Sequence, residues 1–180
     1  LSLICIVIAL ATTSPWNRVQ AAERYNIIPV PAKLIPATGE FELTPQTTIY
    51  AKKAEHVGRF FAGKINQATG YNIQTTNNKK QAGILLLLDK KVKGDEAYEL
   101  SVTPTKVTAK ASTQRGLFYA MQSFMQLLPP QIESSKSTTG IEWKAAACQI
   151  QDQPRFPYRG TLIDVCRHFF TIEQLKKHID

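Results

Sequence analysis

The sequence has few of the residue types that build metal centres and disulfide frameworks. Its 180 residues include only three cysteines and three histidines, and they form no C-x-x-C pair and no Cys/His cluster. We therefore expect no metal site and no cofactor. Beyond residue 22 only Cys148 and Cys166 remain, without the spacing of a disulfide framework. Two buried free thiols are favoured over a bridge, although an exported protein could form one.

Several common catalytic motifs are also missing. No glycine-rich loop precedes a helix with a lysine, and no G-x-S-x-G occurs, so phosphate-loop and nucleophile-elbow chemistry are not indicated. The acidic residues between positions 22 and 153 form no obvious pair, and most fall in predicted turns or on solvent faces. This part of the chain carries no complete catalytic set of its own.

A concentrated basic patch is another absent feature. The net charge is +8, but the lysines and arginines are scattered, and no basic run is interleaved with aromatic residues. One functional hypothesis is a basic nucleic-acid binder, which would show salt-sensitive DNA binding. We favour an evenly solvated basic surface and expect no nucleic-acid partner.

The only long apolar run lies at the start of the chain. "LICIVIALA" spans residues 3–11, which is too short to cross a membrane. It is followed by polar residues and by the small residues of "VQAA", so we interpret residues 1–21 as a signal peptide whose start is missing; the alternative is a buried strand. Ile4 precedes Cys5 where a lipoprotein signal needs a small residue, so we expect no stable membrane anchor. We therefore expect the protein to be exported to the periplasm or the extracellular space.

Residues 22–153 alternate strand and helix patterns, which predicts an α+β domain with a mixed β-sheet and two main helices. Three prolines between residues 27 and 43 exclude a helix there and favour an edge strand or turns. The expected strands are 71–75, 84–88, 98–102, 106–111 and one within 141–154. The run "ILLLL" at 84–88 does not alternate, so it should be buried on both faces.

The two helices are expected at 54–69 and 113–128. The apolar face of the first is formed by Val57, Phe60, Phe61, Ile65 and Ala68. Gly70 follows as its C-terminal cap. The second has Ser112 as a candidate N-cap, and Pro129–Pro130 ends it.

A new unit is predicted at 154–180. The segment from Tyr158 to Val165, with the run "GTLIDV", reads as a buried strand. It ends in a polar cluster of Asp164, Cys166, Arg167 and His168, and Thr171 is placed to cap a helix. A strand, a charged cluster and a helix are typical of one βα unit of a (β/α)8 barrel, in which residues at the strand ends form the active site. The alternative is a structural ion pair of Asp164 with Arg167 or Arg159.

The segment "FPYRGTLIDVCRHFFTIEQLKKHID" resembles the start of the catalytic barrel of family 20 glycoside hydrolases, the β-N-acetylhexosaminidases. The pattern F-P-[YH]-R-G-x-x-x-D-x-x-R-H-[FY] carries the resemblance. Upstream, "AYELSVTPTKVTAKAS" and "RGLFYAMQSFMQLLP" look like the small α+β domain that precedes this barrel. The resemblance covers nearly the whole chain after the predicted signal peptide.

This resemblance implies removal of terminal β-linked N-acetylglucosamine or N-acetylgalactosamine from glycans, with retention of configuration. The acetamido oxygen of the substrate attacks the anomeric carbon, an Asp orients the acetamido group, and a Glu is the general acid and base. That differs from a pair of enzyme carboxylates of which one is the nucleophile.

For this chain, the resemblance implies that Arg159 binds hydroxyls of the terminal sugar, since a guanidinium can donate several hydrogen bonds. Asp164, Arg167 and His168 are assigned to the pocket rim. The catalytic Asp–Glu pair is expected beyond Asp180, so the chain should be a truncated, inactive fragment. Its α+β domain would contact the missing barrel, and Phe169 and Phe170 would be partly unburied. The alternative is a non-catalytic carbohydrate-binding or interaction module.

Overall fold

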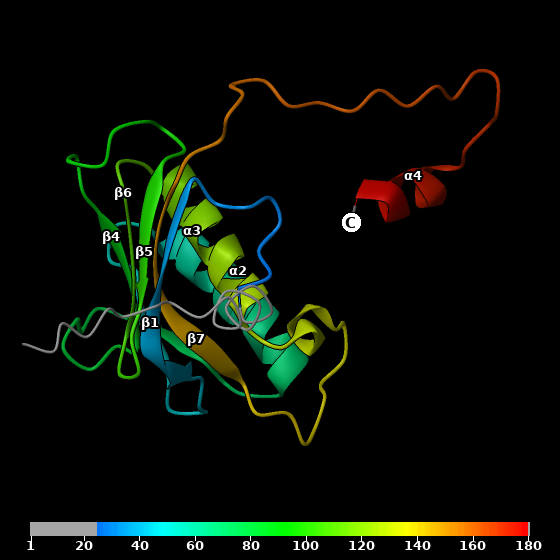
Figure 1. The fold of residues 1–180 in the computed structure, drawn as a ribbon. Helices are drawn as coiled ribbons and strands as arrows, with labels where there is room; N and C mark the ends of the chain where they lie inside the picture. Colours follow the sequence, from blue (N-terminus) through cyan, green and yellow to red (C-terminus); the bar gives the residue numbers. More distant parts are fainter. Residues whose placement is uncertain (1–24, 180) are drawn as a thin grey trace, which may run out of the picture.

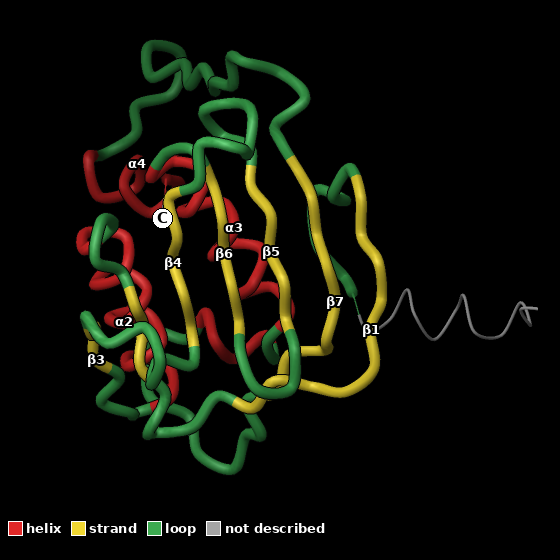
Figure 2. The backbone as a smooth tube through the Cα atoms, turned by 90° about the vertical axis from the view of Figure 1, so that its left-hand side faces the viewer, coloured by secondary structure: helices red, strands yellow, loops and turns green. Residues whose placement is uncertain are grey.

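The computed structural model describes residues 25–179, which contain a seven-stranded mixed sheet covered on one face by two helices (Figure 1). The predicted signal peptide lies outside the described residues. The opposite face of the sheet carries no helix of the described chain, as Figure 2 shows by placing all helices behind the strands. The predicted fold class, a mixed sheet with two main helices, is confirmed.

The sheet has the strand order β1-β7-β5-β6-β4-β2-β3. Strands β1, β7, β5 and β6 pair in antiparallel fashion, while β6, β4, β2 and β3 pair in parallel. The strands are β1 (Lys33–Glu42), β2 (Thr48–Tyr50), β3 (Gln74–Thr76), β4 (Ile84–Leu88), β5 (Tyr98–Val102), β6 (Val107–Ala111) and β7 (Lys144–Asp152). The strand predicted at 71–75 is therefore shorter and begins later.

The proline-punctuated region forms the edge strand β1, as predicted. Pro36 lies within β1, which among the described strands pairs only with β7, and the register shifts between Pro36 and Glu40. Gly39 occupies this bulge with φ 97°, a conformation that favours glycine. Proline has no N–H to donate to a neighbouring strand. An edge strand, which has a partner strand on one side, can therefore accommodate Pro36.

Helix α2 (Glu55–Thr69) ends as expected. Gly70 has φ 73°, and its N–H donates to the Asn66 carbonyl at 2.9 Å, which satisfies a terminal carbonyl. The predicted apolar face was wrong at one residue, since Phe60 is 42% exposed while Phe61 is buried. Phe60 instead packs beside Phe61 and Phe118 on the outer side of the helices, at ring-centroid distances of 5.1 and 5.6 Å.

Helix α3 (Gln114–Leu127) begins one residue later than predicted. Its N-cap is Thr113, whose hydroxyl oxygen accepts from the Gly116 N–H at 3.3 Å. Ser112 was the wrong candidate; its hydroxyl donates to the Gly94 carbonyl at 2.7 Å. The short 3-10 helix η1 (Pro130–Glu133) follows directly.

Strand β4 is central but is only partly buried on both faces. Ile84, Leu85 and Leu86 are buried, whereas Leu87 is half-buried and Leu88 is 37% exposed. The prediction of burial along the whole run was therefore wrong at its C-terminal end, at Leu87 on one face of the sheet and at Leu88 on the other.

The two cysteines of the described chain are free, as favoured, but only one is buried. Cys148 lies in the core on β7, and Cys166 is exposed in the C-terminal segment. Burial raises the pKa of the Cys148 thiol to about 11.

The segment from Tyr158 to Val165 does not form the predicted buried strand. It has no strand conformation, and Leu162 is 96% exposed. A strand depends on hydrogen bonds from a neighbouring strand, and no described strand pairs with this segment. Phe169 and Phe170 are exposed, in agreement with the prediction. The chain then forms α4 (Ile172–Ile179), set apart from the sheet (Figure 1). Among the described helices, none is long and apolar enough to cross a membrane.

Candidate functional site

The predicted site residues lie in the extended stretch that joins β7 to α4. In Figure 1 this stretch runs away from the sheet before it reaches α4. Arg159 stands near its beginning, and Asp164, Arg167 and His168 stand near its end. No hydrogen bond or ion pair of the described residues joins Arg159 to the other three.

Asp164 and Arg167 contact each other. The Asp164 Oδ2 atom lies 2.9 Å from Arg167 Nε, and its Oδ1 accepts from the Cys166 N–H at 2.8 Å. The carboxylate thus shapes a local turn and orients the guanidinium, although both groups remain accessible to solvent. This is one of the two ion pairs expected under the structural alternative. His168 is exposed beside them.

Helix α4 begins with a reciprocal cap at Thr171, as the sequence predicts. The Gln174 N–H donates to the Thr171 hydroxyl at 3.3 Å, and the Thr171 N–H donates to Gln174 Oε1 at 2.8 Å. This is the capping-box arrangement, which satisfies two terminal donors. Glu173 follows in the first turn, where backbone and Thr171 hydrogen bonds lower the pKa of its carboxyl.

Arg159 is bound to the α+β domain. Its Nη2 donates to Glu96 Oε2 at 2.9 Å and to the Tyr119 hydroxyl at 3.0 Å. Its Nη1 donates to the Phe156 carbonyl at 2.6 Å. The guanidinium carbon also lies 5.7 Å from the centroid of the Tyr119 ring, within range of a cation–π contact. The interactions with Glu96 first, and then with the Tyr119 hydroxyl, raise the pKa of Arg159.

Glu96 and Tyr119 are the residues that sequence reasoning missed. Glu96 lies in the loop between β4 and β5, among acidic residues that form no obvious pair in the sequence, and Tyr119 is half-buried on α3. They are 63 and 40 residues from Arg159 in the sequence. The sequence indicated the contact only weakly, through a tyrosine that lies beside the buried residues of a predicted helix.

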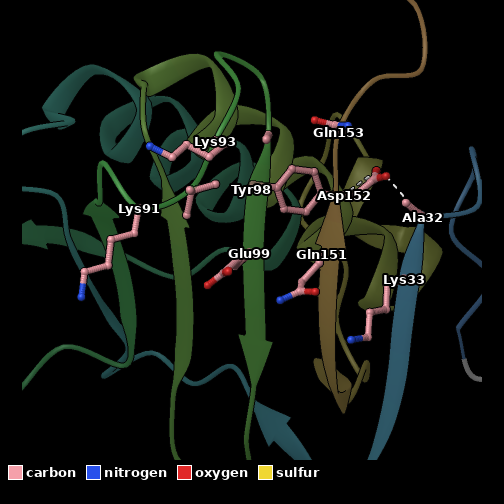
Figure 3. Close-up of a pocket in the computed structure, with 11 residues that line it drawn as sticks. Ala32, Lys33, Lys91, Lys93, Tyr98, Glu99, Gln151, Asp152 and Gln153 are labelled. Atoms are coloured by element: carbon pink, nitrogen blue, oxygen red, sulfur yellow. Dashed lines mark hydrogen bonds between the residues drawn. The ribbon is translucent and has the colours of Figure 1, made fainter.

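A shallow depression of about 380 Å³ lies at the upper end of β1, β5 and β7 (Figure 3). Two of its polar side chains, Asp152 and Tyr98, have structural partners. Asp152 accepts from the Ala32 N–H at 2.9 Å and from the Tyr98 hydroxyl at 3.2 Å, and that hydroxyl also lies 2.6 Å from Ser123 Oγ. This network joins β1, β5, β7 and α3, and we assign it to the stability of the fold.

Comparison with known proteins accounts for both parts of the chain. The family model described as glycosyl hydrolase family 20, domain 2, matches residues 24–153, and the model of the family's catalytic domain matches residues 156–180. The chain belongs to glycosyl hydrolase family 20. The domain boundary near residue 153 stays a prediction.

Named relatives agree with the family. A β-hexosaminidase of Porphyromonas gingivalis is 32% identical over 98% of this chain, and a β-N-acetylhexosaminidase of Cellulomonas fimi is 29% identical over 83%. The solved structure of Streptomyces plicatus N-acetyl-β-hexosaminidase in complex with Thio-NAglucal superposes on 87% of this chain with 34% identity and a TM-score of 0.78.

The matches cover only part of these larger proteins. The chain spans 24% of the Porphyromonas protein, 30% of the Cellulomonas protein and 32% of the Streptomyces structure. It corresponds to their α+β domain and to the first residues of their catalytic domain.

Proposed function

We propose that this chain is part of a β-N-acetylhexosaminidase, which hydrolyses terminal β-linked N-acetylglucosamine or N-acetylgalactosamine in glycans. The observation that carries the proposal is the continuous match to both family 20 domains, in the order that the family has. The relatives named as hexosaminidases support the same reaction. An N-acetylhexosamine at the end of a glycan is the proposed substrate.

The proposed reaction uses the acetamido oxygen of the substrate as the nucleophile. An Asp would orient the acetamido group, and a Glu would protonate the leaving oxygen and later activate water. In the family this pair lies further along the sequence than the position of Asp180, so we expect the 180-residue chain alone to be inactive. Its own contribution is the α+β domain and the polar cluster before α4.

Within that cluster, Asp164, Arg167 and His168 are proposed to line the rim of the pocket. The Asp164 carboxylate holds the Arg167 guanidinium at 2.9 Å, so the pair can present fixed hydrogen-bond donors at one end of the segment. The predicted sugar contact of Arg159 stays a prediction.

A chromogenic β-N-acetylglucosaminide tests the function. The coding sequence is read past Asp180, and any longer product is assayed beside the 180-residue chain. Hydrolysis by the longer product alone is expected. Activity in neither protein would favour the alternative, a non-catalytic carbohydrate-binding or interaction module, and activity in the short chain would mean that it contains an unrecognised catalytic acid.

Export is proposed as well, on the strength of the apolar run at residues 3–11 and the small residues that follow it. The mass of the protein recovered outside the cytoplasm tests this proposal. Cleavage near residue 21 is expected, and an uncleaved cytoplasmic product would refute it.

A further inference from the structure

The end of the sheet beside the β4–β5 loop carries lysines from two distant parts of the chain. Lys33 is the first residue of β1, and Lys91 and Lys93 lie in the β4–β5 loop. All three are exposed, and they line the shallow depression of about 380 Å³. Figure 3 shows Lys33 on one side of Glu99 and Gln151, and the two loop lysines on the other side. Basic residues that are scattered in the sequence are thus brought together by the fold.

Glu99 and Gln151 face the side of the sheet that carries no described helix. Gln151 of β7 pairs with Lys33 of β1 on one side and with Glu99 of β5 on the other. Tyr98 precedes Glu99 and points to the helix side, where its hydroxyl lies 2.6 Å from Ser123 Oγ. Because side chains alternate between the two faces of a strand, Lys33, Gln151 and Glu99 form a row on the open face.

The charged and amide groups at this end of the open face have no partner within the domain. Among the described residues, no hydrogen bond or ion pair engages the side chains of Lys33, Lys91, Lys93, Glu99 and Gln151. A ligand can therefore bind these groups in exchange for water, without breaking a contact of the protein. The set offers three ammonium groups to an anion, and a carboxylate and an amide to hydroxyl groups.

We propose that this end of the open sheet face binds an acidic glycan, in which sugars that carry a carboxylate alternate with N-acetylhexosamine. The ammonium groups of Lys33, Lys91 and Lys93 pair with the carboxylates of such a chain. Glu99 accepts hydrogen bonds from the hydroxyl groups between the carboxylates, and the amide of Gln151 can donate to them or accept from them. Charge complementarity and hydrogen bonding to hydroxyl groups together define the class of ligand.

Two features favour a sparsely charged glycan over a nucleic acid. DNA carries one negative charge per about 1.7 Å of its axis, and the Glu99 carboxylate, which lies between the lysines, would repel a phosphate beside it. A glycan with a carboxylate on every second sugar can place uncharged hydroxyl groups against Glu99. Among the described residues that line the depression, only Tyr98 is aromatic, and it is buried, so no ring is offered for base stacking.

This inference rests on the proposed function for the class of ligand, since a β-N-acetylhexosaminidase acts on glycans. The surface itself lies on the side of the sheet opposite to α2 and α3 (Figure 2). Every residue that forms it belongs to the α+β domain. Binding there would hold a glycan on the protein without cleaving it, so the 180-residue chain is sufficient to test the site.

Amide chemical shifts of the ¹⁵N-labelled 180-residue chain test the site. The probe is a hyaluronan decasaccharide at low ionic strength, because salt screens exposed charges. Saturable shifts are expected at the residues of the row and of the β4–β5 loop. Lys91→Gln combined with Lys93→Gln should raise the Kd about three- to tenfold, since exposed ion pairs contribute modestly. Lys79→Gln combined with Lys80→Gln is the matched control, because it removes the same charge from the exposed turn between β3 and β4.

Chitohexaose, an uncharged chain of N-acetylglucosamine, should bind about tenfold more weakly than hyaluronan, because it lacks the carboxylates. Equal binding of the two glycans would overturn the proposal, and so would a DNA duplex that shifts the same amides with equal affinity. The proposal also fails if hyaluronan shifts no amide of the row, or if the control pair weakens binding as much as the loop pair does. Hydrolysis by a longer product is measured separately, so the proposed function and this site can fail independently.

Discussion

The substitution of Gly116 by alanine should destabilise the domain, although it introduces the best helix former. Gly116 lies in the first turn of α3, where the helix approaches the start of β5 and the end of β6. A Cβ atom there would lie 2.7 Å from the Ala111 Cβ and would also overlap the Ala97 carbonyl oxygen. The carbonyl belongs to backbone next to a paired strand, so it has little freedom to move.

The magnitude follows from two opposing effects. Overpacking of a filled core costs about 1–3 kcal/mol, while replacing glycine by alanine in a helix contributes up to about 1 kcal/mol. The net expectation is a loss of roughly 1–2 kcal/mol in the free energy of unfolding. Gly63→Ala is the matched control, because Gly63 lies within α2 and nothing is found within 4 Å of its added Cβ. It should stabilise the domain by about 0.5–1 kcal/mol.

Urea unfolding of the 180-residue chain, followed by circular dichroism, measures both variants. With an m-value of about 2 kcal/mol/M, the midpoints of the two variants should differ by roughly 1 M. Equal stabilisation by both alanines would refute the reasoning, because it would show that α3 can move away from the sheet at no cost. An unchanged Gly63 variant would instead show that helix propensity is not limiting in α2.

Three further results are expected. Tyr98→Phe should cost about 1–2 kcal/mol in urea unfolding, because it removes the hydroxyl that bonds to Ser123 and Asp152; Tyr50→Phe, on the short strand β2, serves as the control, and equal losses would contradict the role of the network. Iodoacetamide at pH 8 should modify Cys166 and spare Cys148 until the chain unfolds, as mass spectrometry of the peptides would report; rapid labelling of Cys148 would show that the core opens. Because burial raises the pKa of Cys148 from 9.0 to about 11, the unfolded chain loses this proton first, so stability should fall as the pH rises from 9 to 11; urea midpoints across this range should fall less in Cys148→Ala.

The α+β domain could be predicted well because its signals are local. Gly70 follows an apolar face at helical spacing, two prolines follow α3, and the hairpin of β5 and β6 has period-two alternation; each signal lies within a few residues of the element it defines. The error in the N-cap of α3 is also local, a displacement by one residue. Ser112 and Thr113 are adjacent hydroxyl residues, and only the backbone conformation shows which of them begins the helix.

Phe60 illustrates an error of a different kind. Its spacing fits the apolar face of α2, but it contributes to an exposed aromatic group with Phe118 of the neighbouring helix. The packing of two helices side by side determines which residues at the border of an apolar face are covered. A single-helix pattern contains no information about the neighbour.

The contact of Arg159 with Glu96 could not be predicted from the sequence. Both residues occur in polar stretches, and 63 positions separate them. The resemblance assigned a role to Arg159 from a motif, and the motif does not record which domain the side chain faces. The fold shows which residues contact Arg159, because it brings the β4–β5 loop, α3 and the segment after β7 to one place.

The segment at 158–165 shows why an apolar pattern is a conditional prediction. The pattern states what would be buried if neighbouring strands were present, since both the hydrogen bonds and the apolar cover of a parallel strand come from other segments. Helix α4 forms nevertheless, because its hydrogen bonds and its cap at Thr171 are internal to residues 171–179. If strand partners were supplied by a family 20 catalytic domain, Leu162 should change from exposed to buried while the cap of α4 stays unchanged. The difference between the two elements therefore follows from where their partners lie in the sequence.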